Sequence, residues 1–240
     1  IVIERGKGSV LIDVTGRKYL DGNASIWTNL HGHNHSRINR SIKKQLAKVA
    51  HSSALGLANE PASVLAEKLV KAAGHPLRRV FYSDDGSTGL EAALKMSYEH
   101  NRRIGRSKAP NFLSLTRSYH GDTVGATSLG QIELFRQPYS GILFKTGKVM
   151  SPYCYRCPFN KAKPDRQDAR VGRKCKWECI GKLEAKLKPR KYAGLVVEPL
   201  VQGAAGMIMH PSGWLKRASD EAKGTGTQLI ADEVMTGFGR

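Results

Sequence analysis

Apolar residues recur along the chain with spacings that differ from one region to the next. They alternate over residues 10–14 and lead into a Thr-Gly pair, which predicts a β-hairpin over residues 8–20. They then recur at three- and four-residue steps over 37–50 and 62–73. This spacing predicts two amphipathic helices, the first with Ser36 as its N-cap.

Further along the chain, short apolar runs alternate with helical segments. The predicted strands are 80–83, 112–115, 194–197 and 229–231, and the predicted helices are 88–103, 177–187 and 213–223, the last with Ser212 as N-cap. Near-continuous apolar strands separated by helices predict an α/β fold: a mostly parallel sheet with helices on both faces, preceded by the small N-terminal hairpin. Ligands of such sheets bind beyond the carboxyl ends of the strands, so we expect the functional residues in the loops there.

Length and composition predict a globular protein without a membrane partner. The 240 residues are 40% hydrophobic and 25% charged, and no apolar run approaches the roughly 18 residues of a membrane helix. No signal-peptide pattern opens the chain, so we expect a cytoplasmic protein. The chain begins at Ile1 and stops soon after a buried-looking strand. We therefore expect both ends to be cuts through a longer protein.

Positive charge is concentrated in one stretch of the chain. The net charge is +19, and residues 145–191 carry fifteen Lys or Arg against four Asp or Glu, a net charge of +11. Such a stretch is most simply a solvated basic insertion. It also fits a nucleic-acid-binding module, although no nucleic-acid motif or aromatic platform accompanies it.

All four cysteines lie in this basic insertion. Cys154, Cys157, Cys175 and Cys179 form two close pairs, C-x2-C and C-x3-C, separated by seventeen residues. Four thiolates grouped in this way can hold a structural metal such as zinc. Free buried thiols and paired disulfides are the alternatives, and a reducing cytoplasm disfavours disulfides. The metal site is the weaker hypothesis here.

A turn of small residues separates the first predicted strand from the helix after it. Residues 83–89 read Ser-Asp-Asp-Gly-Ser-Thr-Gly. A helix that starts there offers unpaired backbone N–H groups and the positive end of its dipole, which together favour a phosphate. The turn matches neither the P-loop nor the dinucleotide fingerprint, so a phosphate site and a plain capped turn both remain open.

Polar residues also follow the later strands. The loop after the predicted strand 112–115 holds Tyr119, His120 and Asp122, which offer an aromatic face and an acid/base pair. Glu198 and Asp232 each end a buried strand, where a carboxylate is costly unless a cation meets it. A protonated pyridine nitrogen is such a cation; helix capping or pairing with arginine is the simpler alternative.

Taken together, these segments resemble the class III, fold type I, pyridoxal-phosphate aminotransferases over essentially the whole chain. The matching motifs are Asp21-Gly-Asn-Ala-Ser-Ile-Trp27, Gly32-His-Asn-His35, Asp85-Gly-Ser-Thr88, Tyr119-His-Gly-Asp-Thr123, Glu198-Pro-Leu-Val-Gln-Gly203 and Ala231-Asp-Glu-Val234 with Gly237-Phe-Gly-Arg240. Each is only moderately specific, but their common order is a strong signal. The resemblance implies a cofactor, pyridoxal 5'-phosphate, and transfer of an amino group between two substrates.

The resemblance also implies roles for single residues around that cofactor. Gly86 and Ser87 match the pair that holds its phosphate. Tyr119 matches the aromatic that stacks on its pyridine ring and borders the substrate. Asp232 matches the carboxylate that pairs with the ring nitrogen, and Val234 matches the residue on the opposite face of the ring.

Other implied features lie farther from the ring. Glu198 matches an acidic neighbour of the cofactor, and Trp27 falls in the segment that lines the substrate pocket. The Schiff-base lysine of the family is expected beyond Arg240, so we expect this chain alone to be inactive. Residues 1–50 correspond to the N-terminal part of the small domain, and 51–240 to an incomplete cofactor-binding large domain. Members of the family are homodimers, which implies a homodimer here.

Within the family, the chain is most similar to the subgroup that aminates 8-amino-7-oxononanoate in biotin biosynthesis. The segments that resemble this subgroup include Ser151-Pro-Tyr-Cys-Tyr-Arg-Cys-Pro158. Adenosylmethionine and lysine both remain open as the amino donor, and Ile26-Trp27 stands where some members carry two tryptophans. The alternative is another class III ω-amino or diamine aminotransferase. Met235 disfavours it modestly, because those relatives tend to carry a hydrogen-bonding Gln there.

Overall fold

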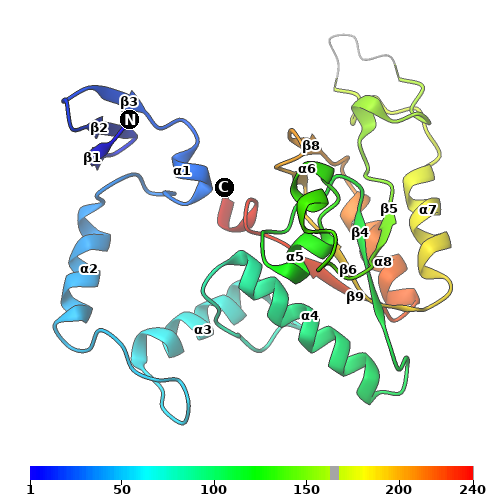
Figure 1. Cartoon of the computed structure of the whole chain (residues 1–240), viewed down its shortest axis with the longest axis horizontal. Coiled ribbons are helices and arrows are strands. Elements are labelled where there is room, and N and C mark those ends of the chain that lie inside the picture. Colours follow the sequence, from blue (N-terminus) through cyan, green and yellow to red (C-terminus); the bar gives the residue numbers. More distant parts are fainter. Residues whose placement is uncertain (163–167, 240) are drawn as a thin grey trace. The chain divides into compact units, whose positions relative to one another are not determined.

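The chain folds into two compact units, Ile1–Tyr82 and Ser83–Gly239. The computed structural model describes residues 1–162 and 168–239 (Figure 1). The centre of the predicted basic insertion and Arg240, the last residue of the final motif, lie outside the described residues.

The first unit contains the predicted hairpin, extended by one strand. An antiparallel sheet is formed by β1 (Ile3–Lys7), β2 (Val10–Asp13) and β3 (Lys18–Leu20), and the helices are α1 (Ala24–Trp27), α2 (Ser36–Leu46) and α3 (Glu60–Ala73). Strand β1 was not predicted. Ser36 was predicted as the N-cap of α2, but it is the first helical residue. His35 holds the cap position without a side-chain hydrogen bond.

The second unit is built on a parallel sheet of four strands. Their order is β5 (Gly147–Val149), β4 (Asn111–Leu115), β6 (Tyr192–Val197) and β9 (Gln228–Ala231), and every neighbouring pair is parallel. All six residues of β6 are buried. This burial is what near-continuous apolar strands predict for a sheet that is covered on both faces.

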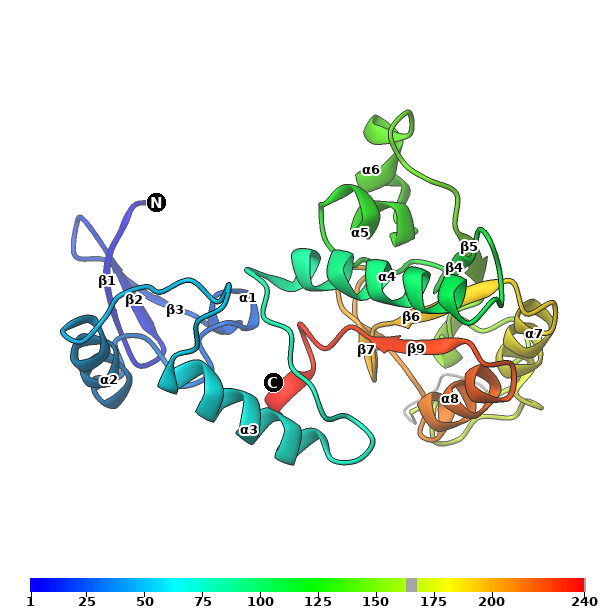
Figure 2. The same cartoon turned by 90° about the horizontal axis from the view of Figure 1, so that it is seen from below.

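Helices pack against both faces of this sheet (Figure 2). On one face, α7 (Glu178–Leu187) and α8 (Trp214–Gly224) form a buried cluster with Leu113, Leu195 and Val197. On the other, α4 (Gly86–Arg103) and α5 (Val124–Leu129) form a second cluster with Phe112 and Val196. Successive residues of a strand point to opposite faces of the sheet, so Val196 packs into one cluster while Leu195 and Val197 pack into the other.

The remaining elements are short. They are α6 (Glu133–Arg136), the pair β7 (Val201–Gln202) and β8 (Ile208–Met209), and the 3-10 turns η1 (Gln137–Tyr139), η2 (Cys154–Arg156) and η3 (Gly237–Gly239). Among the described helices, none combines the length and apolar character needed to span a membrane.

Two further local predictions were wrong. Residues 80–83 are not a strand, because no strand in the described ranges runs beside them to complete a hydrogen-bonded ladder. The N-cap of α8 is Gly213 in a left-handed conformation, with no side-chain cap, rather than Ser212. The positive φ of 79° at this position suits a residue without a Cβ.

Candidate functional site

The carboxyl ends of β4, β6 and β9 lie at one edge of the sheet, because these strands are parallel neighbours. The loop with Tyr119 and His120 follows β4, Glu198 directly follows β6, and Asp232 directly follows β9. The sequence separates these segments by 34 residues or more, and the sheet brings them to one place.

The N-terminus of α4 opens onto the same group of loops. Asp85 caps the helix through a 2.8 Å hydrogen bond from the Thr88 N–H, and Thr88 Oγ1 accepts from the Asp85 N–H at 3.0 Å. This capping box leaves the N–H groups of Gly86 and Ser87 without an acceptor in the described part of the chain. The helix therefore presents free donors and its positive dipole end, as an anion site requires.

Gly86 also connects this helix to the loop after β9. A Cβ at this position would lie 2.3 Å from Cγ2 of Val234, so a side chain there would collide with the valine. Val234 follows Asp232 by two residues, and its N–H donates to Asp232 Oδ1 at 3.2 Å. The helix terminus and the Asp232 loop thus lie against each other.

Asp232 is paired with a histidine that the sequence indicated only as a possible acid/base group. His120 Nδ1 lies 2.8 Å from Asp232 Oδ2, and the histidine side chain is fully buried. Because a carboxylate can only accept, Nδ1 carries the proton in this hydrogen bond. His120 Nε2 is buried and has no partner among the described residues. The interaction offsets part of the cost of burying Asp232.

The loop after β4 also reaches the start of α4. The Asp122 N–H donates to Ser87 Oγ at 3.1 Å. Gly121 has a φ of +117°, and a Cβ there would lie 1.6 Å from Ser87 Oγ. The glycine therefore permits both the local backbone conformation and the close approach to the serine. An aromatic-His-Gly-Asp run after a strand is the sequence signal that could have indicated this contact.

Tyr119 and Glu198 are linked through the backbone. Glu198 Oε1 accepts from the Tyr119 N–H at 3.0 Å, and Oε2 accepts from the Gly203 N–H at 2.8 Å. Burial raises the pKa of the Glu198 carboxyl. Both oxygens of Glu198 are thus occupied by backbone groups, so its evident part is to hold the Tyr119 loop and the turn at Gly203 in place.

The Tyr119 ring has contacts of its own. Its hydroxyl donates to Asp122 Oδ2 at 2.9 Å, and its ring packs edge-on against Phe135. Burial and the Asp122 carboxylate raise the pKa of Tyr119 to about 12. The phenol therefore stays protonated across the neutral range and acts as a donor there.

Trp27 belongs to the first compact unit. It ends α1, where Ala24, Ser25, Ile26 and Trp27 all have positive φ between 51° and 65°. Left-handed residues other than glycine cost about 1–2 kcal/mol each. Asp21 holds this turn by accepting from the Ser25 N–H and hydroxyl, and it also bonds His33 Nε2 at 2.7 Å.

The four cysteines are free thiols. All four line one small cavity beside the start of α7. Within the described ranges, no group of three or more His, Cys, Asp or Glu side chains is placed so that it could hold a metal ion.

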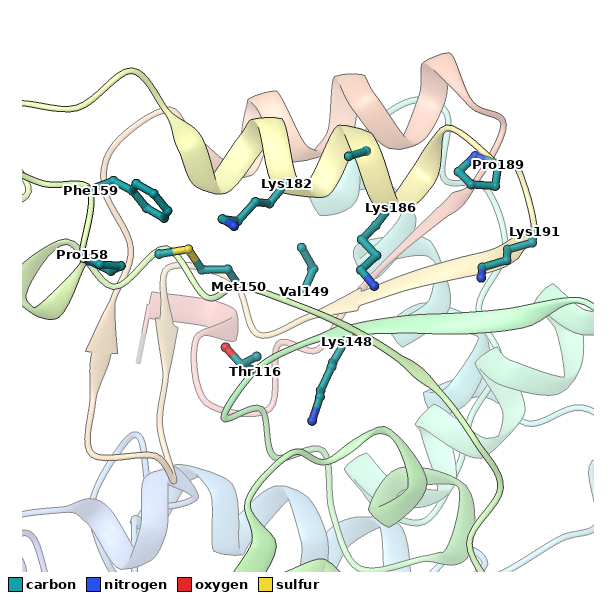
Figure 3. Close-up of a pocket in the computed structure, with 11 residues that line it drawn as sticks. Thr116, Lys148, Val149, Met150, Pro158, Phe159, Lys182, Lys186, Pro189 and Lys191 are labelled. Atoms are coloured by element: carbon teal, nitrogen blue, oxygen red, sulfur yellow. The ribbon is translucent and has the colours of Figure 1, made fainter.

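The basic insertion also contributes to a larger cavity of about 790 Å³ beside the edge strand β5. Figure 3 shows Lys182 and Lys186 extending from α7 towards the segment with Val149 and Met150. This cavity contains none of the predicted site residues, although Thr116 at its border lies three residues before Tyr119.

The site residues can bind a ligand that carries an anionic group at one end and a protonated ring nitrogen at the other. Gly86 and Ser87 offer donors to an anionic group, while the Asp232 carboxylate offers a charge partner to a protonated ring nitrogen. Gly86, Ser87, Tyr119, Glu198, Asp232 and Val234 are connected to one another through the contacts described above.

The chain belongs to the aminotransferase class III family, whose model matches residues 1–240. Among its relatives is the adenosylmethionine-8-amino-7-oxononanoate aminotransferase of Geobacter sulfurreducens, which is 45% identical over 242 residues covering the whole chain. The enzyme of the same name from Methanocaldococcus jannaschii is 41% identical over 244 residues.

Solved structures agree with the fold. The crystal structure of the Methanocaldococcus jannaschii enzyme superposes with a TM-score of 0.88 at 36% identity, covering all of this chain and 50% of that one. A PLP-bound amine transaminase from an uncultivated Pseudomonas species gives 0.88 at 33% identity, covering 53% of that chain. The chain spans about half the length of the curated relatives it matches, 52% for the Geobacter enzyme.

Proposed function

We propose that this chain forms part of a pyridoxal-phosphate-dependent aminotransferase that converts 8-amino-7-oxononanoate to 7,8-diaminononanoate in biotin biosynthesis. The observation that carries the proposal is the 45% identity to a relative with this activity in its name, over the whole chain. The contacts that join the α4 terminus to the Asp232 loop support it, since they bring free backbone N–H groups and a carboxylate to one sheet edge.

The residues would bind the cofactor at its two ends. Gly86 and Ser87 would hold the phosphate through backbone N–H groups, and Ser87 also through its hydroxyl. Asp232, oriented by His120, would keep the ring nitrogen protonated. The cofactor supplies the electron sink that stabilises a carbanion at the substrate carbon.

The remaining side chains would shape and position the site. Tyr119 would stack on one face of the ring and Val234 on the other. Glu198 would act through Tyr119, because its Oε1 accepts from the tyrosine N–H and its Oε2 from the Gly203 N–H. Trp27, on its strained turn, would line the substrate pocket. The base that moves the proton would be the lysine expected beyond Arg240.

We also propose the domain organisation and assembly implied by the family. Residues 1–50 would form part of a small domain and 51–240 the cofactor-binding domain, within a cytoplasmic homodimer. Apolar side chains on one side of α2 support an interface, because Ile38, Ile42 and Leu46 are between 41% and 56% exposed.

The substrate is tested with the full-length protein. Supplied with 8-amino-7-oxononanoate and either adenosylmethionine or lysine, it is expected to form 7,8-diaminononanoate, detected by mass spectrometry, and the productive donor is thereby identified. Turnover of ornithine or 4-aminobutyrate with 2-oxoglutarate, and none with 8-amino-7-oxononanoate, would instead favour another class III aminotransferase.

The ring-nitrogen role of Asp232 is tested by Asp232→Asn. The amide keeps a similar shape but lacks the negative charge, so we expect kcat to fall by about 100-fold or more. The surface variant Asp220→Asn, which removes only an exposed ion pair with Lys216, should leave kcat unchanged. Equal activities of the two variants would contradict the assignment of Asp232.

A further inference from the structure

Glu91 connects α4 to the segment that follows the Tyr119 loop, residues 119–123. Helix α5 begins directly after this loop, at Val124. Glu91 Oε1 accepts from the Gly125 N–H at 2.6 Å and from the Ala126 N–H at 3.3 Å. The first N–H groups of an α-helix have no partner within that helix. A carboxylate from a neighbouring helix supplies the acceptor here.

The start of α5 depends on this acceptor from outside the helix. Thr123 holds the N-cap position without a side-chain hydrogen bond, and the first turn carries no acidic residue. Residues 125–129 are all buried. Because a buried N–H without a partner costs free energy, the Glu91 carboxylate stabilises α5 in the position where its first turn meets α4.

The glycine at position 125 leaves room for this carboxylate. A Cβ there would lie 2.3 Å from Glu91 Oε2, and Gly125 has no positive φ that would require a glycine. Within a helix, glycine is less favourable than alanine. The close approach of Glu91 is therefore the feature of the structure that explains the glycine.

Glu91 and Ser87 lie four residues apart, so they share one face of α4. Ser87 Oγ accepts from the Asp122 N–H at 3.1 Å, and Glu91 accepts from the N–H groups of residues 125 and 126. One helix face thus holds both the end of the Tyr119 loop and the start of α5. The Ser87 hydroxyl only accepts in this contact, so it can still donate to an anion.

The other end of the loop is held at Ser118. Its hydroxyl donates to the carbonyl of Leu129, the last residue of α5, at 3.2 Å, and its own carbonyl accepts from the Gln131 N–H at 2.8 Å. Tyr119 therefore lies between two attachment points, Ser118 and the start of α5. Because the loop between them is short, a shift of α5 would also move the Tyr119 ring.

We propose that Glu91 is a positioning residue for aminotransfer: by holding the start of α5, it fixes the loop that carries the Tyr119 ring. The inference rests on the proposed function, in which Tyr119 stacks on the cofactor ring. Glu91 acts through the two hydrogen bonds that it accepts, not by contact with the reacting atoms. An error of about 1 Å in the position of an active-site group can cost roughly 100-fold in rate.

The test uses the full-length protein with bound pyridoxal phosphate. Glu91→Ala should lower kcat by about 10- to 100-fold and weaken the visible circular dichroism of the cofactor, which reports the asymmetric packing around its ring. Glu91→Gln keeps an acceptor oxygen, so it should restore most of both signals. Glu99→Ala removes a half-exposed partner of Arg103 on the same helix and should match wild type.

Gly125→Ala produces the same defect while Glu91 is retained. The added Cβ must push the Glu91 carboxylate aside, so kcat should fall by about 10-fold or more. In the Glu91→Ala background the carboxylate is gone, and the second substitution should cause no further loss. This non-additivity is expected of two residues in direct contact.

Hydrogen exchange on the cofactor-free protein tests the contact without any use of activity. Glu91→Ala should exchange faster than wild type over residues 119–126, and Glu99→Ala should not. The proposal is overturned if Glu91→Ala keeps wild-type exchange and dichroism, if Glu91→Gln loses as much as Glu91→Ala, or if the losses of Glu91→Ala and Gly125→Ala add. A wild-type protein that binds no pyridoxal phosphate would overturn the proposed function itself, and this inference with it.

Discussion

At the scale of the residue, the candidate site depends on close approaches between loops. Gly121 is the clearest case, because its φ is +117° and Ser87 occupies the space that a side chain would need. Glycine is required here for two separate reasons, and a larger residue would disturb the hydroxyl and backbone proposed to receive the phosphate.

The consequence is tested by Gly121→Ala. We expect a loss of about 1–3 kcal/mol in the free energy of unfolding, from backbone strain, together with weaker retention of pyridoxal phosphate. Urea unfolding and the absorbance of bound cofactor after dialysis measure the two effects. Gly141→Ala is the matched control, because Gly141 has no positive φ and a Cβ there would meet no described atom within 4 Å, so both quantities should stay near wild type.

At the scale of the element, helix α4 links local sequence to the site. Its start is set by Asp85, whose carboxylate binds the Thr88 N–H, while Leu90 and Leu94 pack its first turns into the buried cluster on the sheet. The cap thus fixes where the free N–H groups of Gly86 and Ser87 are displayed.

Two substitutions of Asp85 distinguish the stabilising effect of its cap hydrogen bond from that of its negative charge. Asp85→Ala should lower the free energy of unfolding by about 1 kcal/mol, since it leaves the Thr88 N–H without its acceptor. Asp85→Asn should cost much less, because asparagine is an equally good N-cap. Urea unfolding of the two variants decides the matter, and equal losses would show that the charge of Asp85, not its cap, stabilises the helix.

At the scale of the whole molecule, a buried histidine couples stability to pH. His210 is 8% exposed, its ring packs against Trp214, and its Nδ1 has no partner among the described residues. Burial lowers the pKa of His210 from 6.5 to about 4. The folded state therefore holds the imidazole neutral where the unfolded chain would protonate it.

The direction in which His210 changes the free energy of unfolding follows from which state binds more protons. Between pH 6.5 and about 4 the unfolded state binds more protons at this residue, so His210 contributes stability above 6.5 that is lost as the pH falls. At pH 5 the loss should be on the order of 2 kcal/mol. Urea unfolding at pH 7.5 and 5 should show a smaller pH dependence for His210→Asn than for wild type.

Glu198 does not obscure this comparison. The raised pKa of Glu198 makes the folded state more stable as the pH falls, which is opposite to the effect of His210. Glu198 is present in both the wild type and His210→Asn, so its contribution cancels when their pH dependences are compared. The exposed His51→Gln should retain the wild-type pH dependence. An unchanged pH dependence in His210→Asn would show that the folded protein protonates this histidine freely.

Elements whose signals are local could be predicted from the amino-acid sequence. Helix α4 was expected over 88–103 and runs from Gly86 to Arg103, and strand β6 was expected over 194–197 and includes those residues. Periodicity, caps and apolar runs act between residues close in the chain, so they can be read without knowing the fold. The order of strands and loops likewise placed Glu198 and Asp232 at a sheet edge.

The contacts between distant segments could not be predicted in this way, because they depend on how the chain folds. His120 and Asp232 are 112 residues apart in sequence, and nothing local indicates that they share a hydrogen bond. The two partners of Glu198 are likewise distant in sequence or set by a turn, since its oxygens accept from the N–H groups of Tyr119 and Gly203. The predicted strand at 80–83 has no described neighbour, and the two cysteine pairs share one cavity. Such outcomes depend on packing between distant segments, which local patterns do not encode.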